Sequence, residues 1–236
     1  LGFWIILGMA GALRAKESCA GKPLLQPKRR VLWVVAAMLI ACGPVFAVRV
    51  LASDFHLQKA RIYQNMELRD KVIYECERSV YDYFPNMKAH IYLASALQKK
   101  GELEKAFVEL KTLLRLNPNE PWAHMCLGNI YLRLGRMDKA ISCLKKAVRL
   151  NRAYLTNLGI AYLRNGMGEE AIKCFEKAVG LGCDNELTYT CMGIACERNG
   201  EPDKAVMMYR KALEIDPDCE DASMRLRTIM DRMIPE

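Results

Sequence analysis

The nonapeptide LGNIYLRLG at residues 127–135 decides how this chain folds, because the chain contains a version of it three times. It returns as LGIAYLRNG at 158–166 and as MGIACERNG at 192–200. The small residue in the second position falls at Gly128, Gly159 and Gly193, at spacings of 31 and 34 residues. Self-similarity at a period of about 20–50 residues indicates a repeat architecture, in which one structural unit is stacked several times.

Three other columns recur in register with the nonapeptide, and Ala94 is a further member of the small-residue column. The columns are a Gly, then an Ala, then a bulky residue four positions later: Gly101, Gly135, Gly166 and Gly200; Ala106, Ala140, Ala171 and Ala205; Leu110, Leu144, Phe175 and Tyr209. Small residues let two helices approach closely, and Gly permits the left-handed conformation that ends a helix. The columns therefore predict two helices in each unit, joined at the Gly.

This register resembles the tetratricopeptide repeat (TPR), a helix–turn–helix unit of about 34 residues. Segment 121–151 matches best, through Leu127, Gly128, Tyr131, Ala140, Leu144 and Ala147. The resemblance implies an all-α fold, a TPR superhelix (an α-solenoid), because a single helix pair cannot bury its apolar face alone and must stack on others. It also implies a concave groove for a protein or peptide partner.

The predicted units occupy residues 87–120, 121–151, 152–185 and 186–219. A degenerate unit at 53–86 precedes them, in which Glu67 replaces the column Gly and Val72 replaces the Ala. The step from Gly128 to Gly159 is three residues short, so we expect a tight turn and a kink near residues 150–155. Residues 220–234 are expected to form a capping helix.

Two apolar runs flank a basic segment near the N-terminus. The first, LGFWIILGMAGAL at 1–13, resembles the end of a transmembrane helix, and the second, at 31–48, is 18 uncharged residues long. A membrane crossing needs roughly 20 apolar residues, so we predict one or two membrane helices before the superhelix, one of them at 31–50. The loop at 14–30 holds six Lys or Arg and one Glu, which predicts a cytoplasmic loop and a periplasmic TPR domain at a bacterial inner membrane.

Two alternatives fit the same N-terminal residues. Lys28-Arg29-Arg30, the apolar run and LIACG at 39–43 resemble a bacterial lipoprotein signal, in which Cys42 would carry the lipid. This resemblance implies a TPR lipoprotein of the pilotin or outer-membrane-assembly type. The order of apolar run, basic loop, second run and repeats also resembles the TPR-bearing C-terminal end of bacterial O-antigen ligase or polymerase-type membrane proteins. In that case the catalytic loops would lie upstream of this segment.

The charge distribution argues against nucleic acid as a partner. Of the net charge of +8, residues 14–30 carry +5, whereas residues 53–236 hold 28 basic and 26 acidic residues. A phosphate-binding surface needs its cations on the folded domain. The chain also lacks a P-loop, an HExxH motif, a nucleophile elbow and a dinucleotide fingerprint, so we expect no catalysis and no cofactor.

Neither the histidines nor the ten cysteines predict a metal site. His56, His90 and His124 are 34 residues apart. Equivalent residues of stacked repeats lie about 10 Å apart, whereas Zn²⁺ needs ligand atoms at about 2.1 Å. We expect each His to fill a large-residue position of the first helix. The cysteines show no Cys-x-x-Cys pair, and most are expected to be small core residues.

Candidate groove residues lie in the predicted first helices. Four cations recur near the end of these helices, and four further residues are expected to face the groove: Lys99, Arg133, Arg164 and Arg198; Trp122, Asn129, Asn157 and Ile160. The cations either bind an acidic partner or complement the helix dipole. Trp122 is either an interhelical packing residue or an aromatic anchor for a ligand. The sequence thus predicts a membrane-anchored scaffold that binds a protein or peptide, with an acidic partner as one alternative.

Overall fold

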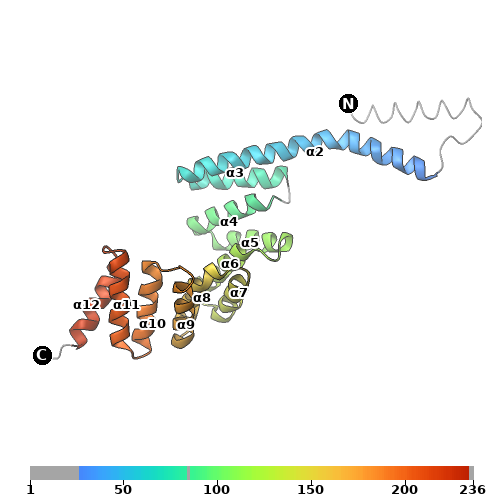
Figure 1. Ribbon diagram of the computed structural model, residues 1–236. Helices are drawn as coiled ribbons and strands as arrows, with labels where there is room; N and C mark the ends of the chain where they lie inside the picture. The colour runs from blue at the N-terminus through green and yellow to red at the C-terminus, as the bar shows by residue number, and fades with distance from the viewer. Residues whose placement is uncertain (1–26, 84–85, 234–236) are drawn as a thin grey trace, which may run out of the picture. The chain divides into compact units, whose positions relative to one another are not determined.

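Every regular element that the computed structural model describes is helical. The structure describes residues 27–83 and 86–233; the apolar run at 1–13 and most of the basic loop lie outside these residues. In chain order the helices are α2 (Pro27–Asn65), α3 (Arg69–Asp82), α4 (Met87–Lys100), α5 (Leu103–Leu116), α6 (Pro121–Arg133), α7 (Met137–Leu150), the 3₁₀ turn η1 (Arg152–Tyr154), α8 (Leu155–Arg164), α9 (Gly168–Val179), α10 (Glu186–Arg198), α11 (Pro202–Ile215) and α12 (Glu220–Met233) (Figure 1). This confirms the all-α prediction.

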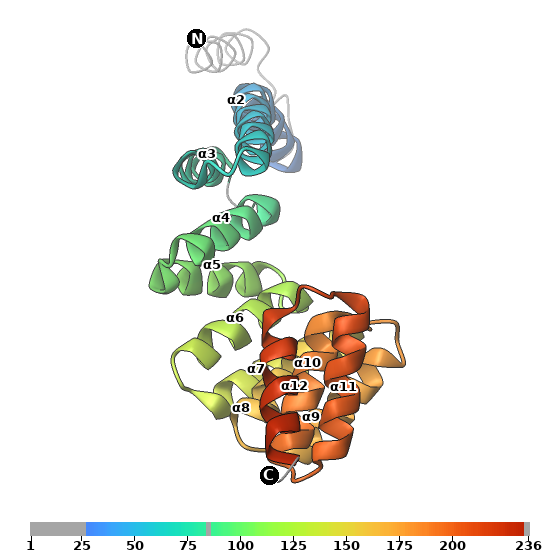
Figure 2. The same cartoon turned by 90° about the vertical axis from the view of Figure 1, so that its left-hand side faces the viewer.

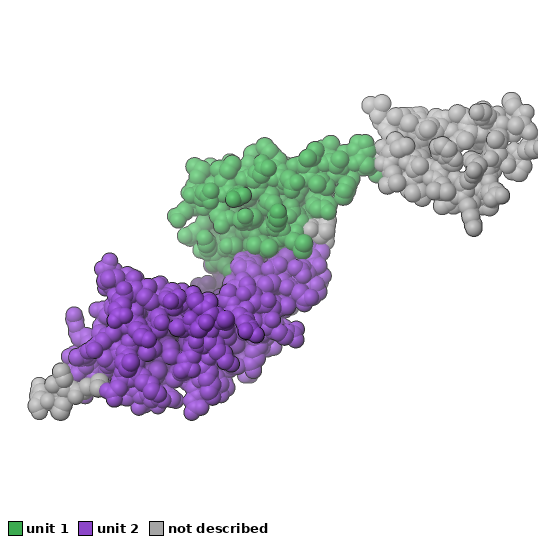
Figure 3. Space-filling model, in the orientation of Figure 1, with its two compact units in different colours: residues 1–100 green, residues 101–236 purple. Residues whose placement is uncertain are grey.

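The chain forms two compact units, residues 1–100 and residues 101–236 (Figure 3). We call them unit 1 and unit 2 and describe each by itself. Unit 1 contains α2, α3 and α4, with α3 packed against both α2 and α4. Unit 2 contains the remaining helices, each packed against the next along the chain, as Figure 2 lets the reader follow.

Helix α2 of unit 1 is one continuous helix of 39 residues, with Pro44 inside it. The sequence predicts a membrane helix at 31–50 and a degenerate repeat that starts at 53 and continues from this helix. In the structure the helix runs through this boundary without a break. Within residues 27–83 and 86–233, no helix combines the length and the apolarity that a membrane crossing needs.

A buried polar contact holds α2 against α3. The Ser53 hydroxyl lies 2.9 Å from the Ser79 hydroxyl, and each hydroxyl is also placed to donate to the other residue's carbonyl oxygen. Asn86 donates from Nδ2 to Ser53 Oγ at 2.9 Å. Both serines are fully buried, so these hydrogen bonds satisfy groups that would be costly to leave unpaired. Small polar side chains thus let the two backbones approach closely.

Glu67 explains how the degenerate repeat makes its turn. The predicted column Gly is missing there, yet Glu67 adopts φ +57°, the left-handed conformation that Gly135 adopts in unit 2 with φ +69°. Non-glycine residues rarely occupy this region. The turn between α2 and α3 therefore keeps the repeat geometry at some conformational cost.

In unit 2 the glycines of the small-residue column lie at close contacts between paired helices. A Cβ atom added to Gly159 would lie 2.5 Å from Phe175 Cε1. The same replacement at Gly128 would meet Leu144, and at Gly193 it would meet Tyr209. These large side chains are fully buried. The helix pairs α6/α7, α8/α9 and α10/α11 are therefore built as the columns predict.

The three-residue deletion falls in the connection before α8. Residues 117–120 separate α5 from α6, whereas Asn151 alone separates α7 from η1, and η1 with α8 covers 13 residues, as α6 and α10 do. The turn η1 leads into α8, and Asn151 Oδ1 accepts a hydrogen bond from the Ala153 amide at 2.9 Å. Helix α8 still packs against α7, α9 and α10, so the stack continues across the short step.

Helix α12 covers the end of the array. Its Ala222 and Ile229 are buried in one cluster with Tyr209. Glu197 of α10 accepts a hydrogen bond from the Tyr209 hydroxyl at 3.1 Å and pairs with Arg225 at 3.5 Å. Helix α12 is thus tied to the last helix pair by apolar contact and by a carboxylate.

Candidate functional site

The first helices α6, α8 and α10 form the inner side of unit 2. Helix α8 packs directly against both α6 and α10. In the described residues, the second helices α7, α9 and α11 show no comparable packing among themselves. The first helices are therefore closer together, as they must be on the concave side of a curved stack. We call the accessible surface of α6, α8 and α10 the inner face.

A row of half-buried apolar side chains lies along the inner face. Met125 of α6, Ile160 of α8 and Ile194 of α10 each pack partly against the core of unit 2 and remain partly exposed. Ile160 and Ile194 both follow the column Gly by one residue, and Asn129 holds that position in α6. Such side chains offer apolar surface to a ligand without unfolding the core.

Two cations at the edge of this row have no partner among the described residues. Arg133 and Arg164 occupy the last turns of α6 and α8 and are exposed. Within the described part of the chain, neither side chain makes a hydrogen bond or an ion pair. They are available to an anionic group of a ligand.

Arg198 and Lys99 differ from these two cations. Arg198 donates from Nη1 to the Leu163 carbonyl oxygen at 3.1 Å and so caps the end of α8, which matches the helix-dipole interpretation. Lys99 ends α4 and belongs to unit 1, where its carbonyl oxygen accepts a hydrogen bond from Arg69. The structure thus places three of the four predicted cations on unit 2, and two of these three lack a partner in residues 27–83 and 86–233.

The other predicted residues are all half-buried. Trp122 lies in the first turn of α6, and Asn157 lies in α8. Asn129 donates from Nδ2 to the Met125 sulfur at 3.1 Å. The sequence analysis missed Met125 and Ile194. The repeat register would have identified Ile194, because it is the equivalent of Ile160.

A buried thiol lies behind the inner face. Burial, together with the nearby Asp221, raises the pKa of the Cys191 thiol to about 11 against the lowering effect of Arg164 and Arg225. The Cys191 thiol is therefore protonated at neutral pH and is a poor nucleophile. It serves as a small core residue, as the sequence predicts for most cysteines.

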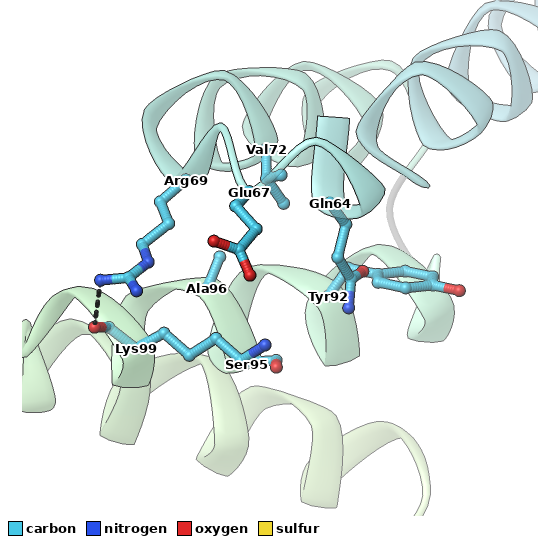
Figure 4. A pocket seen from close by; sticks show the side chains of 8 residues that line it. All are labelled: Gln64, Glu67, Arg69, Val72, Tyr92, Ser95, Ala96 and Lys99. Atoms are coloured by element: carbon cyan, nitrogen blue, oxygen red, sulfur yellow. Dashed lines mark hydrogen bonds between the residues drawn. The ribbon is translucent and has the colours of Figure 1, made fainter. Parts of the chain in front are cut away.

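Unit 1 contains a small cavity of about 90 Å³ (Figure 4). Its lining includes Glu67, Arg69, Tyr92 and Lys99, and Arg69 Nη1 lies 3.2 Å from the Lys99 carbonyl oxygen that it donates to. Ligand pockets usually measure about 300–1,000 Å³. This cavity holds a few water molecules at most and is a packing gap beside the Glu67 turn.

The three histidines have three different environments. His56 pairs with the buried carboxylate of Glu75 and lies 3.6 Å from Asp82, so it links α2 to α3. His90 is buried, as a large first-helix residue should be. His124 Nε2 lies 2.9 Å from the Pro118 carbonyl oxygen. Among the residues that the structure describes, no three His, Cys, Asp or Glu side chains are grouped closely enough to hold a metal ion.

Comparison with known families identifies the repeats. Family models described as TPR repeat or tetratricopeptide repeat match residues 94–135, 121–154 and 151–218. Residues 94–218 are an array of tetratricopeptide repeats. A search of curated proteins finds no match to this chain. The resemblance to an O-antigen ligase is not supported by any of these comparisons.

Solved TPR structures share the fold. The MamA protein is 22% identical, with a TM-score of 0.61 over 70% of this chain and 92% of its own. A thermophilic TPR protein of Thermus thermophilus is 23% identical, with a TM-score of 0.61 over 76% of this chain and 99% of its own. YrrB, described as a TPR protein with an unusual peptide-binding site, is 18% identical, with a TM-score of 0.59 over 73% and 90%. At these identities the likeness concerns the TPR fold alone.

Proposed function

We propose that this chain is a non-catalytic scaffold whose inner face binds a protein segment that carries both apolar and acidic side chains. The TPR fold is typical of protein–protein interaction, and TPR proteins are generally scaffolds without catalysis. One observation carries the proposal for this chain: Met125, Ile160 and Ile194 line a surface that ends at two exposed arginines without partners in the described residues.

The two halves of this surface have different tasks. The apolar row supplies affinity by removing apolar surface from water. Arg133 and Arg164 supply selectivity, because a guanidinium binds a carboxylate with two parallel hydrogen bonds. Since both arginines are solvent-exposed, their contribution should weaken as salt is added.

Charge reversal tests this proposal. Peptides with acidic and apolar residues are screened by fluorescence polarisation against wild-type protein and the Arg133→Glu/Arg164→Glu variant. We expect the variant to fold normally and to bind the selected acidic peptides at least tenfold more weakly. The matched control is Lys139→Glu/Lys146→Glu on the second helix α7, where both lysines are exposed and binding should not change.

Two results would contradict the proposal. Equal peptide affinity of the wild type and the arginine variant would show that Arg133 and Arg164 do not recognise acidic side chains of the partner. Equal losses in the arginine variant and in the lysine control would show a general charge effect instead of a site.

Membrane attachment through residues 31–50 is a separate part of the proposal. It rests on the uncharged run at 31–48 and on the basic excess of residues 14–30. In intact bacterial spheroplasts, added protease should digest the TPR array from the periplasmic side. Digestion that requires lysis of the inner membrane would refute this topology, and a lipid mass increase at Cys42 would identify the lipoprotein alternative.

A further inference from the structure

Helix α2 has two faces of opposite accessibility. Ser53 and Ala60 are fully buried against the rest of unit 1. Among the large apolar side chains of α2 that are more than half exposed, five share one side of the helix, whereas Val45 and Phe46 lie off this side: Val48, Leu51, Phe55, Ile62 and Met66. We call these five residues the α2 stripe. It is an exposed row of apolar side chains on a well-defined helix.

The stripe is narrow and regular. At 100° per residue its five members fall within an arc of about 60°, and Ser53 and Ala60 lie about 160° away from its centre. Val48, Phe55 and Ile62 hold the a positions of a heptad and Leu51 holds a d position, whereas the other two d positions hold the polar residues Gln58 and Asn65. Apolar residues at the a positions recur at the spacing of helices that pair in a coiled coil. Ser53 and Ala60 both occupy the f position of this heptad, which lies on the side of the helix opposite the seam, and α3 covers that side.

The position of α2 in the array explains why the stripe is open. In unit 2, α8 packs against α7 and α10 packs against α9, so each first helix is covered by the second helix of the preceding pair. Helix α2 is the first helix of the described residues, and these residues contain no helix pair before it. Its stripe therefore has no such cover within the described chain.

Two charges beside the stripe favour a second copy of the chain. Asp54 and Lys59 flank Phe55 and occupy the g and e positions of the heptad. In a parallel pair, a g residue faces the e residue that lies five positions later on the other helix. Asp54 of one copy would thus face Lys59 of the other, twice by symmetry. Lys59 Nζ already lies 4.5 Å from the centroid of the Phe55 ring, at the edge of the stripe.

The stripe is large enough for a dimer. Its members span about 18 residues, or about 27 Å of helix. A large apolar side chain exposes about 150–200 Å² when free, so five that are about 60% exposed provide about 500 Å² per copy. Two copies would bury about 1,000 Å², which is the lower bound for a specific interface. We propose that α2 pairs in parallel with α2 of a second copy of this chain.

The test is the molar mass of the purified full chain by sedimentation velocity over a range of concentrations. We expect a dimer for the wild type. The Phe55→Glu/Ile62→Glu variant should keep its helical circular dichroism and should raise the dimer dissociation constant by more than 100-fold. Met207→Glu on α11 is the matched control, because Met207 is an equally exposed apolar residue outside the stripe.

Charge swapping tests whether the partner is a second copy of the chain, and disulfide formation tests whether the two helices are parallel. Asp54→Lys should weaken the dimer, and Asp54→Lys/Lys59→Asp should restore it, because the pair is exchanged between copies. A Val48→Cys variant in a Cys42→Ser background should form a disulfide between the two copies of residue 48, which an antiparallel pair could not form.

Three outcomes would overturn the proposal. The first is a monomer at every concentration, and the second is a dimer that the Phe55→Glu/Ile62→Glu change leaves intact. The third is that the Phe55→Glu/Ile62→Glu change abolishes flotation of the protein with anionic phospholipid vesicles but leaves its molar mass in solution unchanged. This result would assign the stripe to a lipid surface.

Discussion

Replacing Gly159 by Ala should push apart helices α8 and α9, which pack closely at this residue. The added Cβ would lie 2.5 Å from Phe175 Cε1 and 2.8 Å from Cζ. Carbon atoms in contact prefer about 3.5–4.0 Å, so the ring or the helix must move by about 1 Å. The ring of Phe175 is rigid and fully buried, which leaves it little room to turn away.

The magnitude follows from two opposing effects. Overpacking of a core costs about 1–3 kcal/mol. Exchange of Gly for Ala within a helix returns up to about 1 kcal/mol through helix propensity. Gly168→Ala is the matched control, because it lies in the adjacent α9 and its added Cβ would meet its nearest atom, Asn199 Oδ1, at an ordinary 3.5 Å. We expect Gly159→Ala to be less stable than Gly168→Ala by about 1–3 kcal/mol.

Urea unfolding followed by circular dichroism measures this difference, and hydrogen exchange locates it. Neighbouring repeats stabilise one another, so protection should fall in α8 and α9 first and then in the adjacent pairs. In a Phe175→Ala background, the Gly159→Ala change should no longer destabilise the protein, because the opposing ring is gone. Equal stability of Gly159→Ala and Gly168→Ala would refute the repeat register and the packing derived from it.

Two further predictions concern unit 1. His56→Leu should lower the free energy of unfolding by about 2–3 kcal/mol, because it leaves the buried Glu75 carboxylate without its partner. In urea unfolding, the double variant His56→Leu/Glu75→Gln should recover part of this loss. Equal stability of the single and the double variant would contradict the buried pair. Burial, with help from Glu75 and Glu77, raises the pKa of the Cys76 thiol to about 12. An unfolded thiol ionises near pH 8.5, so the wild type should lose stability as pH rises from about 8.5 to about 12, and Cys76→Ala should show a flatter pH dependence.

The inner face was only partly predictable from the sequence. The repeat register located Arg133, Arg164 and Ile160 on the first helices, because equivalent positions of a repeat share one face. It could not separate Arg198 from the other arginines, because the bond to the Leu163 carbonyl depends on how α10 is placed against α8. Lys99 shares the sequence column but belongs to the other compact unit.

The sequence by itself determined the helix pairs, their register and the close contacts at Gly128, Gly159 and Gly193. These features depend on short-range periodicity and on side-chain volume, and the residues of one repeat, about 34 in number, carry both. Only the tertiary structure decided that Glu67 takes the left-handed turn and which side of α2 remains exposed. Those outcomes depend on which neighbouring helix covers a face or stabilises a strained turn, and contacts between distant residues leave no periodic pattern in the sequence.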